Sequence, residues 1–196
     1  MHRLVALVLL LALVGCSGDG GDDAGPSEPS GSEVVTFDPE LRDELVAMMA
    51  EDQKELTGQS ATNNSDARIT RLKEIIDEHG WPTYDLVGEK GEEAAWVIAQ
   101  HADLDPEFQQ QALELLRDAV ADGQASPGNL AYLEDRVAVA QGEPQTYGTQ
   151  VGCQRTGPVP ATPIKDEAGL EERRKEAGLD PYADYVAEMT EICAEG

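Results

Sequence analysis

Basic residues are scarce in this sequence, and their scarcity argues against one class of function. Lysine and arginine together number 14, against 39 aspartates and glutamates, so the formal net charge is −25. Proteins that bind nucleic acid rely on basic patches that release counterions, and no such patch is visible in this sequence. We therefore expect no nucleic-acid partner. Anionic lipid headgroups would also be repelled by so acidic a surface.

Long apolar runs are lacking as well. Residues 4–14 are apolar without interruption, but a helix that crosses a bilayer needs about 20 such residues. His2 and Arg3 precede this run, and a small residue, Gly15, follows it. A short apolar run after a basic start is typical of a secretory signal sequence. We therefore predict that residues 1–15 are a signal peptide and do not span the membrane.

The residues that end this run are Leu13, Val14, Gly15 and Cys16. They resemble the lipobox of bacterial lipoproteins. The resemblance implies that Cys16 is lipidated and becomes the mature N-terminus, with a diacylglycerol that anchors the protein stably in a lipid bilayer. We expect a lipid-anchored protein on the extracytoplasmic face of the cell membrane; no residue decides between the outer face of the cytoplasmic membrane and an outer membrane. The alternative is ordinary secretion, with Cys16 an incidental thiol.

Aromatic residues make up only 5% of the chain, and residues 17–36 contain none. This segment is rich in Gly, Ser, Pro and Asp, so it cannot bury enough apolar surface to offset the entropy lost on ordering. We predict that residues 16–36 form a lipidated, disordered acidic tether. Residues 37–196 are then long enough for one domain with its own core.

Helix signals dominate that domain. Three Pro residues stand directly after a residue that can cap a helix, a pattern typical of helix starts. These pairs are Asp38-Pro39, Asp105-Pro106 and Ser126-Pro127. Apolar residues at helical spacing predict further helices at about 69–79, 89–101, 167–177 and 181–194. We expect an all-α, single compact domain of about seven helices.

The first of these helices carries four apolar residues on its expected inner face. They are Leu41, Leu45, Met48 and Leu56. The helical period is lost between Gly142 and Lys165, where Gly, Pro, Thr and Gln prevail. We call residues 142–165 the arm, and we expect it to be irregular. A long segment of this kind is usually functional or cross-linked.

The chain has only 3 cysteines. If Cys16 carries lipid, then Cys153 in the arm and Cys193 in the last helix remain. An even pair in an exported protein predicts a disulfide bond. The alternative makes Cys153 a nucleophile, but no activating base lies near it in the sequence.

Standard catalytic and metal-binding motifs are absent. The sequence contains no Gly-x-Ser-x-Gly, no His-Glu-x-x-His, no phosphate-binding loop and no Cys-x-x-Cys. A zinc site would have His79 and His101 as its only histidines after signal-peptide removal, and carboxylates would have to complete it. We therefore expect no metal and no cofactor.

Three groups of polar and aromatic residues remain. They are Gly80-Trp81-Pro82; Gln100-His101-Ala102-Asp103 with Asp105-Pro106 and Phe108-Gln109; and Asp135-Arg136-Val137 with Gln145 and Tyr147-Gly148-Thr149-Gln150. In this order they resemble an uncharacterised bacterial domain-of-unknown-function family that carries QHAD…DPxFQ and DRV…YGTQ motifs. The resemblance covers roughly residues 40–185, and Asp52-Gln53 also fits its pattern. It implies a shared fold and supplies no activity.

Two functions from different classes fit these groups. In the first, a surface-tethered domain binds a protein or small-molecule partner, whose identity the sequence leaves unknown. In the second, a hydrolase or transferase uses His101 as its general base. There Asp103 or Asp105 would orient the ring, and Arg136 would neutralise an anionic substrate group. Further candidates for ligand binding are Asp52, Gln53, Gln100, Gln145, Tyr147 and Gln150.

A purely structural role for these residues is the alternative. His101 could cap the end of its helix, and Asp105 could cap the start of the next one. Arg136 could then pair with Asp52 or Asp103 as an internal strut. If the groups form one site, we expect His101 to face Tyr147 and Gln150 of the arm, with Arg136 between them.

Overall fold

The computed structural model describes residues 35–60 and 62–195. The predicted signal peptide, Cys16 and nearly all of the predicted tether lie outside these described residues. In the part of the chain that is described, no helix is both long and apolar enough to cross a membrane.

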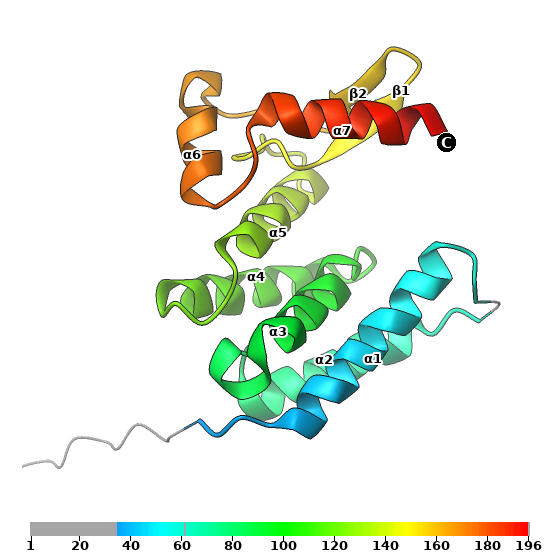
Figure 1. Ribbon diagram of the computed structural model, residues 1–196, viewed down its shortest axis with the longest axis vertical. Helices are drawn as coiled ribbons and strands as arrows, with labels where there is room; N and C mark the ends of the chain where they lie inside the picture. The colour runs from blue at the N-terminus through cyan, green and yellow to red at the C-terminus, as the bar shows by residue number, and fades with distance from the viewer. Residues whose placement is uncertain (1–34, 61, 196) are drawn as a thin grey trace, which may run out of the picture. The chain divides into compact units, whose positions relative to one another are not determined.

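The described residues form seven α-helices, a short 3-10 turn and one two-stranded sheet (Figure 1). The elements are α1 (Pro39–Leu56), α2 (Ser65–His79), α3 (Tyr84–Gln100), α4 (Pro106–Ala121), α5 (Pro127–Ala140), β1 (Val151–Gln154), β2 (Gly157–Pro160), the 3-10 turn Glu167–Gly169, α6 (Leu170–Glu176) and α7 (Tyr182–Glu195). The predicted all-α class and the helix number are confirmed.

The three predicted helix starts are capped by side chains. Asp38 accepts hydrogen bonds from the backbone N–H groups of Glu40 and Leu41, and Asp105 accepts one from Phe108. Ser126 caps α5 in the same way, through Asn129. Each cap satisfies an N–H group that has no partner inside its helix. Asp105 therefore does have the capping role that the structural alternative gave it.

The predicted start of the third helix, at Glu89, marks a kink. Helix α3 begins at Tyr84, but Gly88 has φ of 70° and interrupts the helical backbone. Glycine tolerates this left-handed region because it has no Cβ. The earlier turn was missed because its four residues are too few to show a helical period.

The core lies among α1 to α5, with α1 and α2 packed on α3 and α4 packed on α5. Leu41 and Leu45 of α1 are buried as expected, and Met48 is half-buried. Leu56 contradicts the prediction, because 63% of it is exposed. It ends α1, where the helix extends past the core.

The arm is less irregular than expected, because it contains an antiparallel hairpin. Strand β1 pairs with β2, with Val151 opposite Pro160 and Gln154 opposite Gly157. This hairpin was not predicted because proline lacks the N–H donor that a strand needs for its backbone hydrogen bonds, and so argues against a strand. The prolines at 158 and 160 sit in a short two-stranded sheet, where such losses are tolerated.

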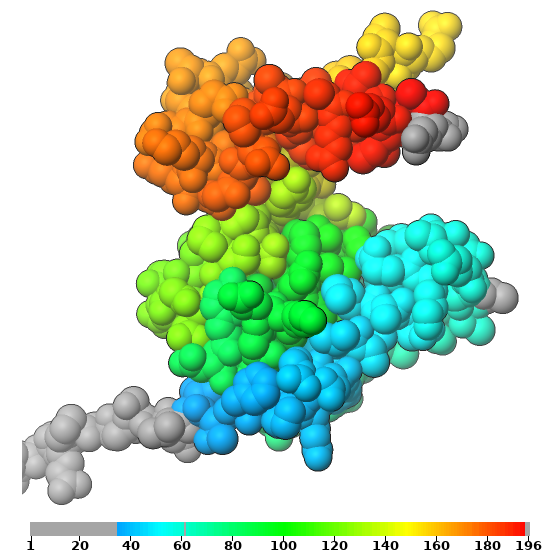
Figure 2. All heavy atoms as spheres, viewed as in Figure 1, coloured from blue at the N-terminus to red at the C-terminus, as the bar shows by residue number. Residues whose placement is uncertain are grey.

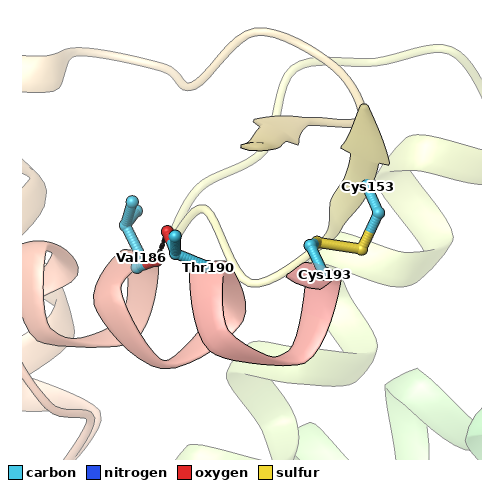
Figure 3. Close-up of a disulfide and its surroundings, with 4 residues drawn as sticks. All are labelled: Cys153, Val186, Thr190 and Cys193. Carbon is cyan, nitrogen blue, oxygen red and sulfur yellow. Dashed lines mark hydrogen bonds between the residues drawn. A yellow bond between two sulfur atoms is a disulfide. The ribbon is translucent and has the colours of Figure 1, made fainter. Parts of the chain in front are cut away.

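A disulfide joins the hairpin to the last helix. Cys153 of β1 and Cys193 of α7 are bonded, with their Cα atoms 5.3 Å apart (Figure 3). The predicted pairing is therefore present. In Figure 2 the side chains of α6 and α7 form one continuous surface in orange and red.

Candidate functional site

His101 ends α3 as its C-terminal capping residue, and its ring contacts α1. The ring atom Nδ1 lies 2.7 Å from Oδ2 of Asp52. The Asp52 side chain is 6% exposed and that of His101 is 22% exposed. Because a carboxylate can only accept a hydrogen bond, Nδ1 carries the proton that joins the two side chains. In the neutral ring, Nε2 then keeps its lone pair.

Arg68 of α2 completes this group. Its Nη2 atom donates to Oδ1 of Asp52 over 3.3 Å and to Oε2 of Glu55 over 2.6 Å. The hydrogen bond from Arg68 lowers the pKa of the Glu55 carboxyl. Atoms Nε and Nη1 of Arg68 are buried, and within the described part of the chain they have no hydrogen-bond partner. Such unpaired buried donors are costly, so they call for an explanation.

These side chains line a cavity of about 170 Å³ between the end of α1, the start of α2 and the end of α3. We call it the His101 cavity. Its lining residues are Asp52, Glu55, Leu56, Asn63, Ser65, Arg68 and His101. The arrangement can bind a small molecule, and Nε2 of His101 can accept a proton from it.

The expected partners of His101 lie elsewhere. Asp103 accepts two hydrogen bonds from Arg136 of α5, over 2.8 and 2.7 Å. Arg136 also donates to Oε1 of Gln150 over 3.4 Å, which ties the end of α3 to the arm. The hydrogen bonds from Arg136 lower the pKa of Asp103. Since 57% of the Asp103 side chain is exposed, this pair adds little stability.

Asp105 lines a different cavity. Its carboxylate caps α4 and also contacts Nζ of Lys73 at 2.5 Å. That cavity, of about 230 Å³, has Phe108 among its lining residues and does not include His101. Thus neither Asp103 nor Asp105 orients the His101 ring, and Asp52 does so instead.

Two more predicted residues belong to the arm, one buried and one half-buried. Gln145 is fully buried and donates to the backbone oxygens of Gln150 and Thr162. The ring of Tyr147 lines another cavity, beside Arg173 and Pro127. The single site in which His101 would face Tyr147 is therefore not what the structure contains.

The remaining predicted residues, Gln53 and Gln100, lie next to Asp52 and His101 in the sequence. The Gln53 side chain donates to Oδ2 of Asp52 over 3.3 Å. The backbone oxygen of Gln100 accepts a hydrogen bond from the buried side chain of Gln109, over 2.9 Å. Gln109 thus satisfies an unpaired carbonyl at the end of α3.

Asp135 of α5 holds the arm in place, and it was not among the predicted site residues. Its buried carboxylate accepts hydrogen bonds from the backbone N–H groups of Thr146, Tyr147 and Thr149, over 2.6 to 3.2 Å. The hydroxyl of Thr149 adds another at 3.0 Å. Gly148 lies between these donors with φ of 70°, and an added Cβ would stand 2.7 Å from Ile164.

Sequence reasoning also missed Arg68, although the sequence carried a signal for it. Arg68 stands four residues before the buried Leu72, so it lies on the inner face of α2. A charged residue at such a position needs a buried partner. Asp135 likewise stands between the buried Leu133 and Val137.

Among the described residues, no group of three or more His, Cys, Asp or Glu side chains could hold a metal ion. Residues 39–194 match the DUF6624 model, described as a family of unknown function. No curated protein and no solved structure matches the chain. The expected resemblance to a domain-of-unknown-function family is confirmed.

Proposed function

We propose a function for this chain, which belongs to the DUF6624 family of unknown function. It is an extracytoplasmic lipoprotein whose helical domain binds a small polar molecule. The signal-like residues 1–15 and the lipobox-like ending at Cys16 support the membrane anchor. The His101 cavity supports the binding role. One observation carries it: the His101 ring, fixed by the buried Asp52 at 2.7 Å, lines a cavity rather than packing into the core.

A ligand screen followed by thermal unfolding tests the binding role. Small polar compounds are added to the detergent-purified full chain and to its His101→Ala variant. A compound at 100 times its dissociation constant adds about 2.7 kcal/mol to the stability. We expect that compound to raise the melting temperature of the parent chain and not that of His101→Ala.

The matched control is His79→Ala, because His79 ends α2 at the surface, outside the cavity. This variant should keep the full ligand response. If His101→Ala loses stability but responds to the ligand as the parent does, His101 has a structural role and the binding proposal fails.

A hydrolase or transferase with His101 as general base is the second candidate. The contact between Nδ1 and Asp52 favours it, since the contact fixes the ring and leaves Nε2 to accept a proton. Asp52 would then be a positioning residue. A panel of chromogenic esters, amides and glycosides tests this candidate, and turnover should be lost in His101→Ala and kept in His79→Ala. Equal turnover in both variants would contradict it.

A further inference from the structure

The charges around the His101 cavity do not balance. Asp52 and Glu55 contribute two carboxylates, whereas Arg68 contributes one cation. While the His101 ring is neutral, the cavity carries one negative charge. The chain as a whole has a formal charge of −25, so its field also attracts cations and repels anions.

Arg68 offers an anionic ligand no donor that is both unpaired and open to the cavity. Its Nη2 atom is shared by the two carboxylates, and its Nε and Nη1 atoms are shielded from solvent. An entering carboxylate or phosphate would meet Asp52 and Glu55 with only the neutral Asn63 and Ser65 to bind it. The cation that the sequence suggested for this purpose, Arg136, is paired with Asp103 outside the cavity.

Atom Nε2 of the His101 ring can accept a hydrogen bond from a ligand. Nδ1 already donates to Asp52, so Nε2 can be satisfied only by a group that carries a hydrogen. We infer that the His101 cavity takes a small uncharged or cationic molecule that donates a hydroxyl or amino hydrogen bond to Nε2, and that it rejects carboxylates and phosphates. This inference rests on the proposed binding function and names its ligand class.

The size and rim of the cavity agree with a small ligand. A volume of about 170 Å³ is below the range of pockets that take drug-sized molecules, roughly 300–1,000 Å³. Leu56 supplies an apolar surface at the rim, where 63% of the residue is exposed. A short carbon chain bearing a hydroxyl or amino group suits both features.

Three probes of one size separate the charge classes. Ethanolamine, ethylene glycol and glycolate share a two-carbon frame and are cationic, neutral and anionic at mildly alkaline pH. Each is titrated into the detergent-purified full chain while the ring protons of His101 are followed by NMR. The His101→Ala variant assigns the resonance, and the exposed His79 serves as the internal control. We expect ethanolamine and ethylene glycol to shift His101, and glycolate to leave it unchanged.

A charge-removing variant tests the cause. With about 6 Å between the charges and a dielectric constant of about 40, removing one charge changes the affinity on the order of tenfold. Glu55→Gln should therefore weaken ethanolamine binding by that factor relative to ethylene glycol binding in the same variant. Glu51→Gln is the control, because Glu51 lies on the same helix outside the cavity.

The outcomes separate this inference from the function on which it rests. If glycolate shifts His101 as strongly as ethanolamine does, the ligand class is wrong while the binding site stands. If none of the three probes shifts His101, the ligand class is overturned, and a thermal screen without any hit at this cavity would remove the binding function too. An equal loss of ethanolamine affinity in Glu51→Gln would also overturn the charge argument.

Discussion

Glu92 of α3 is a carboxylic acid in the interior, away from the His101 cavity. It is 1% exposed, and Oε2 accepts a hydrogen bond from Nδ2 of Asn129 over 3.1 Å. Burial raises its pKa to about 7, against the opposing effect of the hydrogen bond from Asn129. The folded protein therefore holds a proton on Glu92 at a pH where the unfolded chain has released it.

We predict that Glu92 makes stability fall as the pH rises. A folded-state pKa above the unfolded value of 4.5 means that the contribution is full below about pH 4.5 and is lost as the pH passes 7. The difference corresponds to about 3 kcal/mol. Glu92→Gln copies the protonated carboxyl, so its stability should change less between pH 5 and pH 8. Urea unfolding at the two pH values measures the effect.

Glu89 offers the control, because it lies on the same helix but is exposed and does not contribute to the raised pKa of Glu92. Glu89→Gln should keep the pH dependence of the parent chain. If Glu92→Gln shows the same pH dependence as the parent, then burial does not keep this carboxyl protonated.

At the scale of single elements, the arm depends on a helix that precedes it. Thr146, Tyr147 and Thr149 of the arm donate their backbone N–H groups to the Asp135 carboxylate of α5. We predict that Asp135→Asn destabilises the domain by about 2–3 kcal/mol, because the new amide nitrogen would face N–H donors that it cannot satisfy. Urea unfolding measures the size of the destabilisation. Faster amide hydrogen exchange at Thr146 and Thr149 would locate it in the arm.

Glu134→Gln is the control for this prediction. Glu134 is adjacent but only half-buried, and it accepts one hydrogen bond, from the Thr146 hydroxyl. Its loss should cost less than about 1 kcal/mol. Equal losses in the two variants would show that Asp135 has no special role in the arm.

The hairpin and α7 are joined by the disulfide of Cys153 and Cys193, which closes a loop of 40 residues in sequence. We predict that a reductant lowers the stability of the parent chain by about 4 kcal/mol, since the open chain regains loop entropy on unfolding. The Cys153→Ser, Cys193→Ser double variant should show that loss already and should not respond to the reductant. A parent chain with both thiols free to alkylate before reduction would contradict the bond.

Elements with strong local signals could be predicted, whereas contacts between distant elements could not. The caps at Asp38, Asp105 and Ser126 follow from adjacent residues, and so their helices were predicted. The hairpin was not predicted, because its two short strands contain prolines and show no alternation of apolar and polar residues. The pairing of His101 with Asp52 spans 49 positions in sequence, and no local pattern distinguishes it from a pairing with Asp103.

At the scale of the whole molecule, the proposed anchor lies outside the described residues and stays a prediction. We expect Cys16→Ser to release the protein from the membrane, because without acyl chains nothing in the acidic surface favours lipid. Fractionation followed by detection of the protein in soluble and detergent extracts measures this. Cys153→Ser is the control, and it should remain with the membrane.

The domain itself should fold equally well in Cys16→Ser, as judged by its melting temperature. A variant that still appears only in detergent extracts would mean that Cys16 carries no anchor. The extracytoplasmic lipoprotein proposal would then fail, while binding at the His101 cavity would stand.

The dependence of the arm on Asp135 also orders the steps of folding. The carboxylate sits in the middle of α5, so we expect the arm to gain its conformation only after that helix has formed. The bonds between Asp135 and the arm should then be absent from the folding transition state. Their loss in Asp135→Asn would speed unfolding and leave the refolding rate nearly unchanged. The arm is thus expected to order last and to open first, so a protease added under native conditions should cut between residues 142 and 165 before it cuts the helices.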